Sequence, residues 1–157
     1  MKRFALLALP LLLLSVHVQA QETALVYFYR VEEAPRVVKN KPKLRIDGTV
    51  TALFPEREFI GLRLKPGRHV LTLGQPQSAT ALVVEAGRTY YVQVSYTPGG
   101  HGFNGLLDQI FLRDEAQALL HFEQMKRPLE DKNIKRKDLE VVRTPPGATP
   151  PEHRGKG

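Results

Sequence analysis

The segment REFIGLRLKPGRHVLTLG, residues 57–74, carries the clearest strand pattern of the chain. Apolar residues alternate with other residues on both sides of a central Pro66-Gly67 pair, as they do in two half-buried strands. Proline presets φ for the second position of a type II turn, and glycine supplies the positive φ of the third. We therefore predict a hairpin in which Arg68 faces solvent and His69 begins the buried face.

Similar strand patterns occur on both sides of this segment. Asp47-Gly48 lies between two alternating runs and predicts a type I′ hairpin, because both residues tolerate positive φ. Ala86-Gly87 separates ALVV from TYYVQVSY and predicts a third hairpin. Short strands with frequent turns are typical of an antiparallel, immunoglobulin-like β-sandwich, here of about seven or eight strands. The predicted turn residues are Asp47, Gly48, Pro66, Gly67 and Gly87.

One segment near the end of the predicted sandwich has helical periodicity. In RDEAQALLHFEQMK, Asp114 is followed three residues later by Gln117, which is the spacing of a capping box. Pro128 prevents continuation of a helix. We expect one short C-terminal helix near residues 114–126, packed on the edge or the open end of the sandwich.

The two ends of the chain differ in composition from this domain. Residues 1–20 have a basic start, an apolar run too short to span a membrane and small residues near Ala20, which predicts a cleaved signal peptide. The chain has no cysteine for lipid attachment or a disulfide. We expect export to the periplasm or cell envelope without a lipid anchor. The folded domain is predicted over residues 21–127.

Residues 128–157 are charged at first and then rich in proline and glycine, and we predict a largely disordered tail. Most of the net charge of +7 comes from this end of the chain and from the signal. A nucleic-acid reader concentrates positive charge on its folded face, so nucleic acid is not an expected partner. Weak binding to a polyanionic envelope surface is one alternative, through Lys126, Arg127, Lys132, Lys135, Arg136 and Lys137.

The residue patterns that carry chemistry are missing from the sequence. No serine lies in a G-x-S-x-G motif, and no histidine pair has a spacing used for zinc. We predict no catalytic residue, metal or cofactor. A second alternative is a small-ligand or carbohydrate site, or the site of an unrecognised enzyme, at one end of the sandwich. Its candidate contacts are His69, Arg88, His101, Phe103 and Asn104.

Several motifs, taken in order, resemble a family of exported bacterial proteins known as domain of unknown function 2846. They are an aromatic strand ending at Arg30, the Asp47-Gly48 pair, the Pro66-Gly67-Arg68-His69 turn and the AGRTYY segment from Ala86. The resemblance covers about residues 24–124. It implies an all-β sandwich in the cell envelope and brings no established activity. Many such proteins look like lipoproteins, whereas this chain lacks the cysteine for lipid attachment.

The sequence thus predicts a non-catalytic binding or assembly module of the cell envelope. Its partner would be another envelope protein or envelope component, met through an exposed edge strand or an end loop. The sequence makes no prediction of oligomeric state. It leaves open whether His69, at the rim of the core, is bound by a neighbour or available to a ligand.

Overall fold

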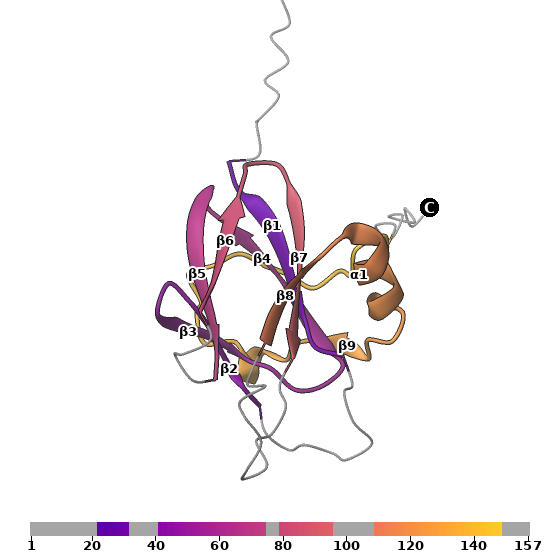
Figure 1. Cartoon of the computed structure of the whole chain (residues 1–157). Helices are drawn as coiled ribbons and strands as arrows, with labels where there is room; N and C mark the ends of the chain where they lie inside the picture. The colour runs from indigo at the N-terminus through magenta and orange to yellow at the C-terminus, as the bar shows by residue number, and fades with distance from the viewer. Residues whose placement is uncertain (1–21, 32–40, 75–78, 96–108, 149–157) are drawn as a thin grey trace, which may run out of the picture.

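The structure, a computed structural model, describes residues 22–31, 41–74, 79–95 and 109–148. About half of these residues lie in strands, which form two facing sheets, and the described residues contain a single α-helix (Figure 1). The prediction of a sandwich-like all-β domain with one helix is confirmed at this level. The predicted signal peptide and residues 149–157 lie outside the described residues.

The first sheet has the order β10-β4-β1-β7-β8, and β9 pairs with β4 as well. Its strands are β1 (Ala24–Tyr29), β4 (Glu58–Leu64), β7 (Thr89–Ser95), β8 (Gln109–Arg113), β9 (Arg127–Pro128) and β10 (Val141–Val142). The second sheet has the order β3-β2-β5-β6. It contains β2 (Lys43–Ile46), β3 (Thr49–Leu53), β5 (Gly67–Leu73) and β6 (Thr80–Val84).

One of the three predicted hairpins is confirmed and two are wrong. Asp47 and Gly48 have φ of 52° and 77°, and they connect the paired strands β2 and β3. Strand β4 pairs with β1, however, while β5 pairs with β2 and β6, so the Pro66-Gly67 turn crosses from one sheet to the other. Gly87 likewise lies in a crossover, between β6 and β7. Turn residues determine where a chain reverses and not which strand it then pairs with.

The predicted antiparallel arrangement holds for most strand pairs but not for two of them. Strand β7 lies parallel to β1, with Leu25 opposite Thr89, and β9 lies parallel to β4. The crossover after β6 returns the chain to the end of the sheet at which β1 begins, where Gly87 N donates to Thr23 O. A strand that re-enters a sheet at this end, after an excursion through the other sheet, runs parallel to the first.

The core lies between the two sheets and follows the predicted alternation of apolar residues. Its fully buried members include Val26, Phe28, Leu62, Leu71 and Val92, which come from both sheets. This shared apolar layer is the main source of stability, because burial of apolar area drives folding of a chain without disulfides.

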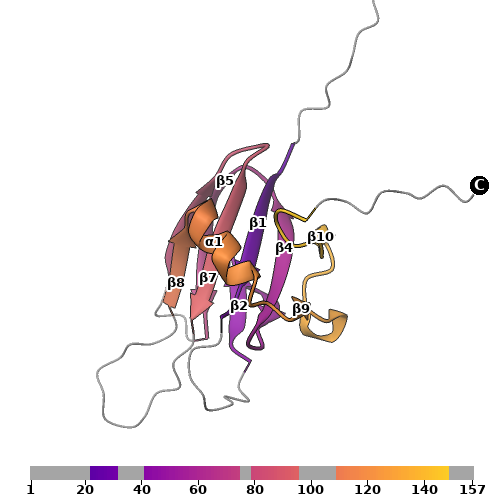
Figure 2. The ribbon, with the colours of Figure 1, turned by 90° about the vertical axis from the view of Figure 1, so that its right-hand side faces the viewer.

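A second apolar cluster covers the outer face of the first sheet. Helix α1 (Glu115–Phe122) lies across that face, as Figure 2 shows, and buries Ala118 and Phe122 against Tyr27, Tyr29, Phe59 and Tyr91. The predicted cap is confirmed, since the Asp114 side chain accepts a hydrogen bond of 2.8 Å from Gln117 N.

Residues 126–148, which we call the strap, pack along one side of the sandwich. The prediction of a largely disordered tail is therefore wrong for residues 128–148. The strap pairs with β4 through β9 and β10 (Figure 2). Ile134 of the strap forms a bridge with Ala52 of β3. It also includes the 3-10 helix η1 (Asp131–Asn133). Thus the strap joins the edges of both sheets.

Few apolar residues anchor the strap to the rest of the sandwich. Leu129 and Ile134 are buried in the main core. Arg127 donates from Nε to the carboxylate of Glu58 at 3.0 Å, and Glu58 is only 5% exposed. Loss of this partner would leave a buried carboxylate without its cation, which is unfavourable. Composition alone underestimated the order of this segment because main-chain pairing to β4 and β3 replaces apolar burial.

Gly61 of β4 provides a test of how the strap packs. A Cβ atom at Gly61 would lie 2.9 Å from Cβ of Val142 and 3.1 Å from Cε1 of Tyr27. We expect Gly61→Val to displace β10 and to lower the free energy of unfolding by about 1–3 kcal/mol, as overpacking does. Urea denaturation followed by circular dichroism measures this change.

Truncation after Glu140 supplies the control, because it removes β10 and keeps β4. Gly61→Val should lower the free energy of unfolding by less in the truncated chain than in the full chain, because the truncated chain lacks Val142. If the losses in the free energy of unfolding caused by the substitution and by the truncation simply add, the predicted contact between Gly61 and the strap is contradicted.

Candidate functional site

A groove of about 510 Å³, which we call the strap groove, lies where the strap passes the end of the sandwich. The Asp47-Gly48 turn, the crossover after β4 and the strap all contribute to its lining. Ile46, Leu64 and Leu139 provide apolar surface. The charged residues that line it are Asp47, Arg63, Lys65, His69, Arg136, Asp138 and Glu140.

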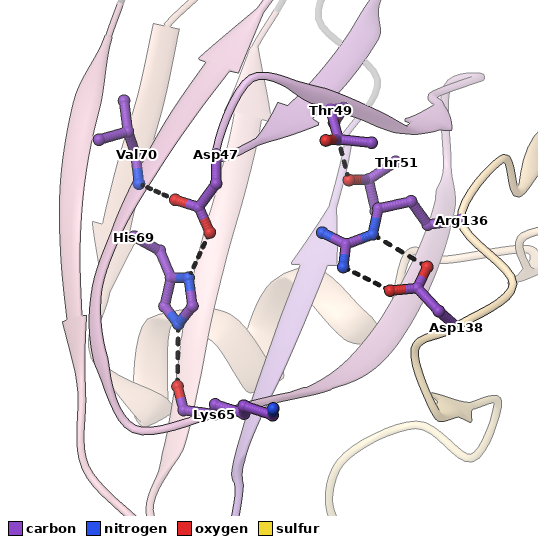
Figure 3. Close-up of polar contacts among 8 residues, drawn as sticks. All are labelled: Asp47, Thr49, Thr51, Lys65, His69, Val70, Arg136 and Asp138. Carbon is purple, nitrogen blue, oxygen red and sulfur yellow. Dashed lines mark hydrogen bonds and ion pairs between the residues drawn. The ribbon is translucent and has the colours of Figure 1, made fainter.

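His69 is held at both ring nitrogens. Figure 3 shows its Nδ1 next to Asp47 Oδ2, at 2.7 Å, and its Nε2 next to the carbonyl oxygen of Lys65, at 2.8 Å. A carbonyl oxygen and an ionised carboxylate only accept hydrogen bonds, so both nitrogens must carry a hydrogen for both contacts to form. His69 is therefore an imidazolium that joins the hairpin turn to the crossover. Neither nitrogen is available as a base or a metal ligand while these contacts hold.

The pKa values of this pair follow from the same contacts. Burial disfavours the imidazolium, but hydrogen bonds to Lys65 O and Asp47 outweigh it and raise the pKa of His69 above 6.5. Burial acts against the carboxylate of Asp47 too, but hydrogen bonds from His69 and Val70 outweigh it and lower the pKa of Asp47 below 3.8. Asp47 Oδ1 accepts a hydrogen bond of 2.9 Å from the main-chain N–H of Val70, so the Asp47 side chain also attaches the turn to the main chain of β5.

Two arginines complete the charged lining. Arg136 contacts both carboxylate oxygens of Asp138, at 3.1 and 2.6 Å (Figure 3). Arg63 of β4 donates a hydrogen bond from side-chain Nε to the Glu140 carboxylate at 3.0 Å. Its main-chain N–H donates to the main-chain oxygen of Glu140. The sequence named His69 and Arg136 for two separate candidate surfaces and did not name Arg63 or Lys65, because these residues come together only in the fold.

The other residues predicted for an end-loop site do not join His69. Arg88 is exposed, forms an ion pair of 3.3 Å with Glu85 and does not line the strap groove. His101, Phe103 and Asn104 lie outside the described residues. Ser95 and Gln109, which flank their segment, lie at the opposite end of the first sheet from Leu64.

The basic residues predicted to contact a polyanion mostly hold the strap together. Arg127 contacts Glu58 and Glu130, and Lys132 also contacts Glu130. The ammonium of Lys135 donates to Lys132 O, and Arg136 pairs with Asp138. Most of these basic side chains are therefore already paired within the fold, and their ion pairs other than Arg127–Glu58 are exposed and each contribute little to stability.

A second polar cluster docks α1 on the first sheet. Tyr29 OH lies 3.1 Å from His121 Nδ1, and Tyr91 OH donates to Glu115 at 3.1 Å. Burial raises the pKa of Tyr29 to about 12. Burial and the positive charge of Arg113 lower the pKa of His121, which favours a neutral ring that accepts from Tyr29. These contacts attach the helix to the sheet.

Arg30 is a buried residue that pattern analysis did not single out except through the family resemblance. Its side chain is fully buried and donates to Phe54 O and to Glu56 Oε1, both at 3.1 Å. The guanidinium thereby fixes the segment that leads into β4. We assign it a structural role.

The described part of the chain offers no group of three or more histidine, cysteine, aspartate or glutamate side chains placed to hold a metal ion. No helix in the same ranges combines the length and apolar character needed to cross a bilayer.

The opposite pKa shifts of the two histidines give a test by mutation. The folded-state pKa of His69 is raised, so its contribution to stability is complete below pH 6.5 and is lost as the pH rises through that raised value. The difference in the free energy of unfolding between wild type and His69→Gln should therefore be largest near pH 5–6 and decline in alkali.

His121→Gln serves as the control with the opposite sign. Because the pKa of His121 is lowered, the wild type loses stability on acidification below pH 6.5, and the variant should not show this loss. Thermal unfolding across a pH series measures both differences. A His69→Gln difference that is independent of pH, or that grows in alkali, would contradict the doubly bonded imidazolium.

Comparisons with known proteins leave the family of this chain undetermined. No family model matches it, and neither a curated protein nor a solved structure does. The resemblance to domain of unknown function 2846 stays a prediction.

Proposed function

We propose that the chain is a non-catalytic binding or assembly module of the cell envelope, exported by its predicted signal peptide. We take its sandwich to be immunoglobulin-like, with seven or eight principal strands and two short additions from the strap. The engagement of both nitrogens of His69 supports a non-catalytic role, because this candidate contact of the alternative end-loop site instead joins two parts of the fold.

The unpaired outer edge of β8 is the observation that carries this proposal. The strap covers the opposite edge of the first sheet, whereas no described strand lies beside β8 on its outer side. An edge strand presents main-chain N–H and C=O groups that an extended polypeptide can pair with. Leu112 on this strand is 54% exposed, an unusual position for a large apolar side chain on an edge.

A second groove lies next to this edge and would receive a side chain of the partner. It has a volume of about 410 Å³ and is lined by Tyr90, Tyr91 and Leu112, with charged groups at Arg113 and Glu115. In strand addition, main-chain hydrogen bonds provide affinity and such pockets provide specificity. The proposed partner is therefore an extended segment of another envelope protein with apolar side chains at alternate positions.

Two alternative functions remain proposals. A small-ligand site close to His69 is favoured by the strap groove and is argued in the next subsection. Binding of a polyanionic surface through the basic tail would depend on Lys126 and Lys137, the two candidate residues whose ammonium groups have no partner among the described residues.

Site-specific photocrosslinking in the native envelope tests strand addition at β8. A photoreactive residue at Leu112 should crosslink to one defined segment of a partner protein, whereas one at Leu120, which is even more exposed on α1, should not. Mass spectrometry of the crosslinked peptides identifies the segment. The purified partner should then slow hydrogen exchange of the β8 amides.

Matched variants complete this test. Leu112→Lys should abolish the adduct formed from a probe at Ile110, because a charged side chain on an edge strand opposes pairing. Leu120→Lys should leave the adduct unchanged. Equal labelling from Leu112 and Leu120, labelling only from Val83 on the edge strand β6, or β8 amides that stay unprotected would each contradict the proposal.

A further inference from the structure

The strap groove contains cationic donors that the protein does not use. In the side chain of Arg63 only Nε donates a hydrogen bond, to Glu140, whereas Nε and Nη2 of Arg136 both donate to Asp138. Nη1 and Nη2 of Arg63, Nη1 of Arg136 and Nζ of Lys65 therefore have no acceptor among the residues that the structure describes. A guanidinium carries five N–H donors, so most of the capacity of Arg63 and part of that of Arg136 is unfilled.

The ion pairs of the groove share one asymmetry. The side-chain exposures are 25% for Arg63 and 68% for Glu140, 23% for Arg136 and 63% for Asp138, and 15% for His69 and 48% for Asp47. In each pair the cation is the more buried partner and the carboxylate is the more exposed one. The paired cations of the groove are thus more buried than their carboxylates, which form its exposed rim together with the ammonium of Lys65.

The rim carboxylates are no strong barrier to another anion. Exposed ion pairs contribute only about 0–1 kcal/mol, so an incoming anion can share or displace Glu140 and Asp138 at small cost. The groove volume of about 510 Å³ lies within the range of small-molecule sites, and Leu64 and Leu139 add apolar surface.

We propose that the strap groove binds a small anionic molecule that carries at least two carboxylate or phosphate groups, held by Arg63, Lys65 and Arg136. Arginine pairs with both group types through two parallel hydrogen bonds, and lysine adds a mobile point charge at the mouth. His69 adds a positive charge to the wall while both of its hydrogen bonds hold, and it makes no direct bond to the ligand, because Asp47 and Lys65 O occupy its nitrogens. The proposal does not depend on strand addition, since β4 and β8 lie on opposite sides of the first sheet.

Two soluble probes, pyrophosphate and citrate, test this site in the full mature protein by NMR. Each is titrated at constant ionic strength against sodium chloride, because exposed charges are screened by salt. We expect saturable shifts of amides around Leu64, His69 and Arg136 with at least one probe. Arg136→Gln should weaken binding by about tenfold or more, the scale of one hydrogen bond to a charged group.

Lys65→Gln is the variant that leaves the fold intact, because the Lys65 ammonium has no contact to lose among the described residues. It should weaken binding at least about threefold, a fraction of a full charge-assisted bond at an exposed position. Arg88→Gln removes a positive charge at the same end of the sheet but outside the groove, and should leave affinity unchanged.

Three results would overturn the proposal. The first is shifts no larger than those produced by chloride. The second is an equal loss of affinity in Lys65→Gln and Arg88→Gln, which would indicate a diffuse charge effect. The third is a response only to vesicles of phosphatidylglycerol and phosphatidylcholine and to neither soluble probe, which would indicate a membrane surface in place of a small molecule.

Discussion

The two hydrogen bonds of the His69 ring are the interaction on which the local architecture depends. One bond reaches Asp47 in the β2–β3 turn and the other reaches the main chain at Lys65, where the chain passes between the sheets. A neutral imidazole could keep only one of them, so the protonated form is required for both. The ring thereby fixes how the end of the second sheet lies against the crossover, and it forms one wall of the strap groove.

The strap adds the second constraint. By pairing with β4 and reaching β3, it covers one side of the sandwich and brings Arg136 and Glu140 to the same groove as Arg63. On the opposite side, no strand among the described residues pairs with the outer edge of β8, where Leu112 is exposed. The two proposed binding surfaces therefore follow from one asymmetry: within the described residues, the strap pairs with one side of the sandwich and leaves the β8 side unpaired.

How much the sequence could predict depended on whether the determinants were local. The Asp47-Gly48 turn and the Asp114 cap lie within a few residues of the groups they order, and both predictions are confirmed. The Pro66-Gly67 pair marks a true reversal, but no local signal distinguishes a hairpin from a crossover to another sheet. The strap groove was out of reach because Arg63 and Arg136 are brought together only by long-range pairing.

The protonation state of the His69 ring is the most direct test of this account. Two-bond proton–nitrogen correlation spectra of the imidazole, recorded across a pH series, report the state of each ring nitrogen. The account predicts hydrogens on both Nδ1 and Nε2 at mildly acidic pH, with a deprotonation midpoint above pH 6.5. A neutral tautomer at mildly acidic pH, with a transition at or below 6.5, would contradict it.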